Sequence, residues 1–262
     1  MAVRRLLNLR YPATCHICKA KLAPGTRAWW DRAAHAATCI ACDLEHPADP
    51  FTVVEPAFRG VAGGSAQAEH DRRASNPNHS RRATAPWQKG SDGEQHLSTY
   101  LRKDANGRFT LLDDLRIPNS RAQIDHLAIA PSGIYVIDAK NYTGKASRRV
   151  DGILRWRTEH LIVNGRDRTK LTTGMKRQTK AVRTALGLLD TFDDVPITSV
   201  LCFVGNGDWG KLAPTFKVNG VHVLWPRPLK KLLRKDGQLT GDHRAKLARL
   251  LSTQLSPASG QA

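Results

Sequence analysis

The sequence lacks any apolar run approaching the roughly 20 residues that a bilayer-spanning helix needs, and its basic N-terminus lacks the apolar segment of a secretory signal. We therefore expect a cytoplasmic protein with no membrane partner. Acidic residues are also scarce: 23 Asp and Glu stand against 41 Lys and Arg, so the formal net charge is +18. A chain this basic attracts polyanions, and nucleic acid is the commonest of them. Solubility alone is the alternative explanation for the charge.

Cysteine is scarce as well, but four of the five cysteines form two Cys-x-x-Cys pairs, Cys15, Cys18, Cys39 and Cys42. This spacing is typical of a structural Zn²⁺ site with four thiolates, and a module this small needs the metal in order to fold. Three histidines are rival ligands: His16, His35 and His46. We interpret residues 1–54 as a zinc-ribbon-like module, which resembles zinc ribbons and treble-clef fingers. The fifth cysteine, Cys202, lies in an apolar run and is expected to be a buried thiol.

Residues 55–89 are rich in Ala, Gly, Ser, Asn, Pro and Arg and show no period of two or 3.6. Such a composition predicts a flexible basic linker. Its arginines either contact phosphates without specificity or are simply solvated.

The stretch 123–140 predicts a β-hairpin. Two runs of aliphatic and β-branched residues, 123–130 and 134–140, are joined by a tight Pro-Ser-Gly turn. Asp138 and Lys140 are two residues apart and point to one face of their strand, and an antiparallel partner can bring Asp125 close to them. Two carboxylates and an ammonium in an apolar hairpin predict a site for a hard divalent cation. An Asp–Lys ion pair at the sheet rim is the alternative.

The remaining pattern of residues 90–256 predicts a mixed α/β (α+β mixed sheet) domain. A helix begins near Ser91 and carries Glu94 in its first turn, where an acid either favours the helix dipole or reaches the metal. A strand over 109–117 precedes the hairpin. A long helix over 171–189 follows the hairpin, and then comes a buried strand over 198–204.

This order, helix, three strands, helix, strand, resembles the PD-(D/E)xK nuclease superfamily, and within it the nuclease-related (NERD) domain. The matching segments are Gly93-Glu94, Ile124-Asp125-His126-Leu127, residues 133–142 and Gly144. The resemblance covers about residues 89–206 and implies a restriction-endonuclease-like core. Asp138 stands where the family more often has Glu, and Gln178 matches a glutamine that the family's second helix directs toward the active site.

The resemblance implies a metal-dependent endonuclease that hydrolyses phosphodiester bonds of DNA. Asp125 and Asp138 would bind Mg²⁺ or Mn²⁺, with the carbonyl of Ala139 as a third ligand. Glu94 would hold a second ion or a metal-bound water, and Lys140 would orient the attacking water. Seven cations are candidates for contacts with the nucleic-acid backbone: Arg121, Lys145, Arg148, Arg149, Lys176, Arg177 and Lys180. Few aromatic side chains lie among them, so we expect electrostatic, salt-dependent recognition.

Two other functions stay open. One is a non-catalytic nucleic-acid-binding protein in which the acids form only an ion-pair cluster. The other is a scaffold or regulatory protein whose zinc module binds protein. The resemblance is also compatible with a homodimer that cuts both strands.

Overall fold

The computed structural model describes residues 4–32, 34–45, 58–75, 81–103, 105, 107–120, 122–153, 156–187, 192, 194–205, 214–255 and 258. Arg121 and His46, which were candidate site residues, lie outside these ranges. None of the helices within the described ranges has an apolar stretch long enough to span a membrane.

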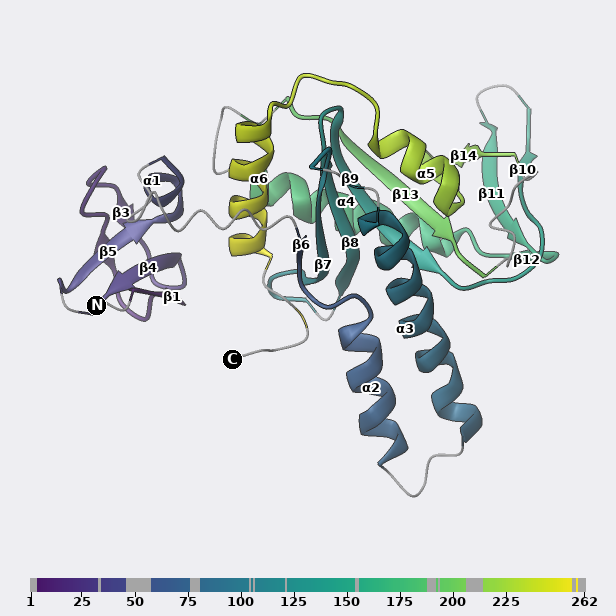
Figure 1. Cartoon of the computed structure of the whole chain (residues 1–262), viewed down its shortest axis with the longest axis horizontal. Coiled ribbons are helices and arrows are strands. Elements are labelled where there is room, and N and C mark those ends of the chain that lie inside the picture. The colour runs from purple at the N-terminus through teal and green to yellow at the C-terminus, as the bar shows by residue number, and fades with distance from the viewer. Residues whose placement is uncertain are drawn as a thin grey trace.

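A mixed sheet of seven strands forms the centre of the described chain (Figure 1). Its strands, in spatial order, are β14 (Phe216–Val218), β15 (Val221–Leu224), β13 (Ile197–Phe203), β9 (Gly133–Lys140), β8 (Gln123–Ala130), β7 (Thr110–Arg116) and β6 (Phe58–Arg59). Strands β7, β8 and β9 are an antiparallel meander, whereas β13 runs parallel to both β9 and β15. The expected mixed α/β class and the order helix, meander, helix, strand are therefore confirmed.

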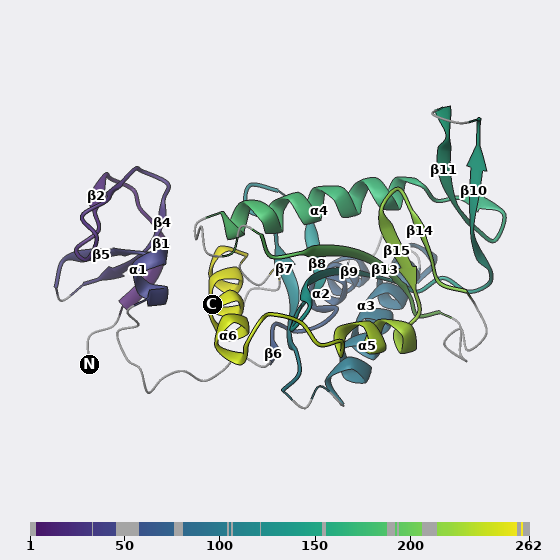
Figure 2. The ribbon, with the colours of Figure 1, turned by 90° about the horizontal axis from the view of Figure 1, so that it is seen from above.

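Helices cover both faces of this sheet (Figure 2). Helices α4 (Lys170–Leu186) and α6 (Gly241–Gln254) pack on one face, and α3 (Arg81–Arg102) and α5 (Pro226–Leu233) pack on the other. Seven of the eight residues of β9 are buried, because apolar side chains on both faces of this strand meet a helical layer. This double cover explains why β9 reads as a continuous apolar run.

The prediction of a flexible linker at 55–89 is wrong for its described residues. Helix α2 (Gly64–Ala74) occupies part of it, and α3 begins at Arg81 rather than near Ser91 (Figure 1). Helix α2 packs along α3, and the main chain and hydroxyl of Ser65 both donate to Asp114. Ser91 is buried inside α3 and donates to the carbonyl of Gly63 at 3.1 Å. Tertiary contacts of this kind stabilise helices that local composition does not predict.

A three-stranded arm projects from the core between β9 and α4 (Figures 1 and 2). It consists of β10 (Ala146–Asp151), β11 (Thr158–Val163) and the short β12 (Arg166–Asp167). The main-chain amide of Asn219 donates to the Glu159 carboxylate at 2.6 Å and thereby joins the arm to the β14–β15 turn.

The N-terminal module has its own small sheets and one helix. Its elements are β1 (Arg4–Asn8), β2 (Ala13–Thr14), β3 (Lys21–Leu22), β4 (Arg27–Asp31), β5 (Ala36–Cys39) and α1 (Ile40–Glu45). Helix α1 lies against α6, where Arg249 donates to Asp43 at 2.9 Å and Ile40 joins the main core. The module is therefore packed onto the rest of the chain and not only tethered to it.

A buried carboxylate joins α3 to the meander. Asp113 of β7 is fully buried and accepts hydrogen bonds from Ser98 at 2.7 Å, from His126 Nδ1 at 2.7 Å and from Arg102. Burial alone would raise the pKa of Asp113, but His126, Ser98 and Arg102 outweigh it and hold that pKa below its ordinary value. This carboxylate is thus stabilised in its charged form.

We expect Asp113→Asn to lower the free energy of unfolding by about 3 kcal/mol, because it leaves buried donors without a charged acceptor. Thermal melting followed by circular dichroism should show a decrease of about 6–12 °C. Because the folded-state pKa is lowered, the stabilisation is complete above the unfolded carboxyl pKa of about 3.9 and is lost as the pH falls through the folded value. The difference between the variants should therefore shrink below about pH 4. Asp236→Asn, at an exposed ion pair with Arg108, is the matched control and should change the stability by less than about 0.5 kcal/mol.

Candidate active site

Two aspartates and a lysine meet where β8 and β9 separate. The last paired residues of this hairpin are His126 and Ile137, so Asp125 and Asp138 lie one residue beyond them on adjacent strands. The Lys140 ammonium contacts Asp138 Oδ1 and lies 4.0 Å from Asp125 Oδ2. The structure therefore brings together the three groups that the sequence singled out.

The position of this cluster follows from the strand order. Strands β9 and β13 are parallel neighbours and end at the same edge of the sheet, where Lys140 pairs with Phe203. Ligand sites of open α/β sheets lie outside the carboxyl ends of such strands. The three side chains remain partly accessible there, with 17% of Asp125, 10% of Asp138 and 25% of Lys140 exposed.

The main chain fixes one carboxylate of the cluster. The Ala139 amide donates to Asp125 Oδ2 at 2.9 Å. Burial and the neighbouring Asp138 raise the pKa of Asp125 well above its ordinary value. Burial alone would lower the pKa of Lys140, but Asp138 and Asp125 outweigh it and raise that pKa. The lysine is thus a permanent cation at neutral pH, and crowding of the acids favours a further positive charge nearby.

Glu94 approaches the cluster from α3 because Gly93 lets the helix come close. A Cβ on Gly93 would lie 3.0 Å from side-chain atoms of both Asn141 and Val204, which directly follow β9 and β13. Burial raises the pKa of Glu94 to about 7; Asp138 contributes to the increase, and Lys140 opposes it. Among the described residues, only the cysteines place three or more ligand atoms within 4.8 Å of one another, so Glu94 does not close a three-carboxylate cluster.

The other predicted site residues lie on two elements. Gln178 is on α4, which covers one face of the sheet, and its Oε1 is buried without a hydrogen-bond partner. The other six predicted cations that the structure describes are exposed on α4 and on or next to the arm: Lys176, Arg177, Lys180, Lys145, Arg148 and Arg149. Arg148 pairs with Glu159 at 3.2 Å and Arg149 with Asp151 at 3.3 Å. The roles of these residues in binding or catalysis stay predictions.

The sequence did not lead us to a role for His126, which follows Asp125 in β8 and therefore points to the opposite face of that strand. His126 is fully buried; its Nδ1 donates to Asp113 and its Nε2 has no hydrogen-bond partner. The signal was present, because an acid within the apolar strand 109–117 and a histidine within the hairpin both require buried polar partners.

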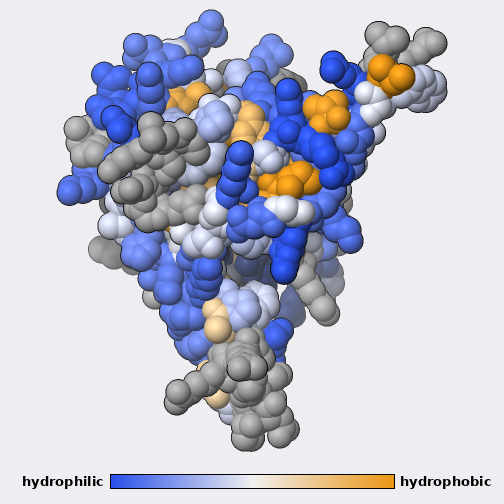
Figure 3. All heavy atoms as spheres, turned by 90° about the vertical axis from the view of Figure 1, so that its right-hand side faces the viewer, coloured by the Kyte–Doolittle hydropathy of each residue, from blue (hydrophilic) through white to orange (hydrophobic). Residues whose placement is uncertain are grey.

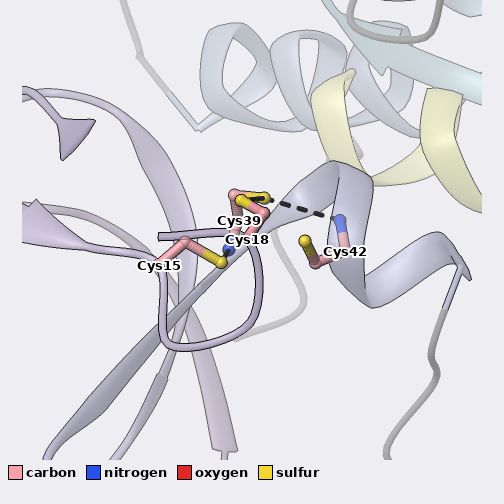
Figure 4. Close-up of side chains that lie close together, drawn as sticks. All are labelled: Cys15, Cys18, Cys39 and Cys42. Carbon is pink, nitrogen blue, oxygen red and sulfur yellow. Dashed lines mark hydrogen bonds between the residues drawn. The ribbon is translucent and has the colours of Figure 1, made fainter. Parts of the chain in front are cut away.

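The four paired cysteines converge in the N-terminal module (Figure 4). Their sulfur atoms all lie within 4.8 Å of one another, and Cys18 and Cys39 Sγ are 3.7 Å apart. A tetrahedral Zn²⁺ with Zn–S bonds of about 2.3 Å requires sulfurs about 3.8 Å apart, so the cluster can bind zinc. His16 is not part of it, because its Nδ1 lies 3.1 Å from the Thr38 hydroxyl.

The four cysteines are so close together that a bound cation would stabilise their thiolate forms. Burial and the adjacent sulfurs raise the pKa of Cys42, and burial also raises that of Cys39. Burial would raise the pKa of Cys15 too, but main-chain N–H groups, first that of Cys39, lower it to about 6. Thiolates crowded in this way need a positive ion between them.

The comparison with protein families identifies the core. Residues 89–204 match the family model of the nuclease-related domain, NERD. This segment is a NERD domain. It contains Glu94, the β8–β9 hairpin with its cluster, the arm, α4 and β13. Comparisons with curated proteins and with solved structures find no match.

Proposed function

We propose that the chain is a metal-dependent nuclease that hydrolyses phosphodiester bonds of DNA. The observation that carries the proposal is the convergence of Asp125, Asp138 and Lys140 at the edge of a NERD domain. The net charge of +18 supports a polyanionic substrate.

The donor set fits a hard divalent ion. Asp125, Asp138 and the Ala139 carbonyl offer only oxygen ligands, which Mg²⁺ and Mn²⁺ prefer, and Mg²⁺ needs only one or two carboxylates beside a substrate phosphate and waters. The Lys140 ammonium lies close to both carboxylates, which supports the proposal that these acids favour a cation. When bound, the ion would polarise the scissile phosphate and lower the pKa of a water molecule.

The residues of the chain then have distinct tasks. Because its pKa is raised, Lys140 does not remove a proton at neutral pH; it orients the attacking water and stabilises negative charge that develops on the phosphate. Glu94 holds a water molecule or a second ion from the α3 side. Gln178 orients a water or a substrate oxygen from α4. Zn²⁺ in the four-cysteine site has a structural role, because four thiolates leave no open ligand position.

A plasmid-nicking assay tests the proposal. With Mn²⁺ or Mg²⁺ we expect supercoiled DNA to become nicked and then linear, and we expect no cleavage when EDTA is present. Absence of cleavage, combined with DNA binding that weakens steeply with salt, would instead support the non-catalytic nucleic-acid-binding function. Absence of both would favour the scaffold function of the zinc module.

A further inference from the structure

A cationic cavity of about 300 Å³ opens where α3, the segment after β9 and the base of the arm meet. Lys89, Arg166 and Arg168 contribute positive charge to it, and none of the described residues that line it is an acid. Cavities of this volume accommodate small ligands or parts of larger ones. Positive charge from α3 and from the base of the arm, without a neutralising carboxylate among the described lining residues, favours an anionic group.

The walls of this cavity are held in place. The Arg168 guanidinium lies over the Tyr142 ring at 5.4 Å from its centre, which orients the planar donor group. The Asn164 side chain accepts from and donates to the main chain of the segment after β9. The Asn141 side chain donates to the carbonyl of Lys89 at 2.8 Å and ties this segment to α3. A guanidinium group held in this orientation can donate two parallel hydrogen bonds to a phosphate. It therefore suits phosphate oxygens better than an acceptor that takes a single hydrogen bond.

The cavity lies close to the carboxylate cluster along two elements. Tyr142 follows Lys140 by two residues, which span at most about 7 Å of extended chain. Lys89 precedes Glu94 by five residues of α3, or about 7.5 Å along the helix axis. Successive phosphates of one DNA strand advance by about 3.4 Å along the helix axis, so these spans place the cavity within about two nucleotides of the cluster.

The arm extends this positive surface outward. Between residues 145 and 170 the chain has eight Lys and Arg and three acids. Each acid is engaged within the arm: Asp151 with Arg149, Glu159 with Arg148, and Asp167 with His160. This side of the molecule is predominantly hydrophilic (Figure 3). Because the three acids are paired and the Lys and Arg outnumber them, this part of the molecule has a net positive charge. Such a surface suits the repeated phosphates of a nucleic-acid strand.

We propose that the cavity binds a backbone phosphate of the DNA strand, within about two nucleotides of the bond that is cut. The position relative to the cut rests on the proposed function. The phosphate contact itself does not, because binding can be measured in EDTA, where no cleavage occurs.

The first experiment is fluorescence anisotropy in EDTA with a labelled oligonucleotide and a series of NaCl concentrations. Arg166→Gln/Arg168→Gln should weaken binding about tenfold and reduce the slope of log affinity against log salt by about one to two. The matched control Arg227→Gln/Arg234→Gln removes the same charge from exposed positions on and next to α5 and should leave the slope unchanged. Equal losses in both double variants would overturn the proposal. Lys89→Gln, at an exposed position, should reproduce part of the loss if the double variant melts early.

The second experiment locates the phosphate. A single neutral methylphosphonate linkage, placed in turn at one and two nucleotides from a mapped cut, should slow cleavage by the wild type at one of these positions but should not slow cleavage by the double variant any further. Binding that depends instead on a 5′-terminal phosphate would overturn the internal position. If the salt slopes behave as expected and no variant or wild type cleaves, the proposed function fails while the phosphate contact stands.

Discussion

Replacing either Asp138 or Lys140 with alanine is expected to abolish Mn²⁺-dependent cleavage of DNA and to leave DNA affinity nearly unchanged. Asp138→Ala removes a proposed carboxylate ligand, and Lys140→Ala removes the cation that we propose orients water and stabilises developing charge. Losses of such preorganised groups cost about 10³-fold in rate or more. Affinity should persist because the proposed contacts with the DNA backbone come from cations of the arm and α4, and not from the carboxylates. The nicking rate with Mn²⁺ and the anisotropy in EDTA measure the two quantities separately.

Two controls separate a catalytic role from a structural one. Asp138→Glu keeps the carboxylate and matches the acid more common in the family, so it should retain cleavage. Asp236→Ala removes an almost fully exposed acid and should change neither rate nor affinity. Undiminished cleavage by both alanine variants would remove the catalytic assignment. A loss accompanied by unfolding would appear as a lower melting temperature, so each variant is melted first.

Local patterns predicted the hairpin and its cluster because both depend on near neighbours. The Pro131-Ser132-Gly133 turn needs a glycine at its last position: Gly133 has φ 134°, and a Cβ there would lie 2.6 Å from the Pro196 carbonyl oxygen. Strand alternation placed Asp138 and Lys140 together, and the short loop placed Asp125 opposite them. No long-range contact was required for this inference.

Features that depend on distant segments were missed. Helix α2 has no buried residue and no apolar face, so its helical state rests on contacts with α3 and Asp114. The cationic cavity joins residues 89, 142 and 164–168, which no sequence period connects. The Asp113–His126 hydrogen bond joins β7 to β8, and it depends on the pairing register of these two strands, which the local sequence does not give. Helix α2, the cavity and this hydrogen bond all depend on contacts between distant segments, and not on the local preference of residues for a helix or a strand.

Removal of zinc is expected to unfold the N-terminal module. Binding of a structural Zn²⁺ contributes about 10 kcal/mol or more to folding of such modules. Little apolar core supports the module without it: besides cysteines, its own buried cluster contains Leu9, Leu22, Ala28 and Ala37, and Ile40 packs into the main core. Cys42→Ser, or a strong chelator, should release the ion and make residues 4–45 sensitive to protease. Trp29, which packs against the main core, should report the change as red-shifted fluorescence. Metal analysis of the purified protein should give one zinc per chain for the wild type.

Cys202→Ser is the matched control, because Cys202 is buried in β13 and takes no part in the four-cysteine cluster. This variant should keep its zinc and its protease resistance. Full zinc content in Cys42→Ser would contradict the four-thiolate site. The NERD domain should stay folded without the ion, because its hydrophobic core lies on both faces of the central sheet, whereas the module packs against α6 and adds side chains such as Ile40 to this core. If DNA cleavage survives when the module unfolds, the chemistry belongs to the NERD domain alone. If cleavage is lost together with the folded module, the contact between α1 and α6 positions the domain for its substrate.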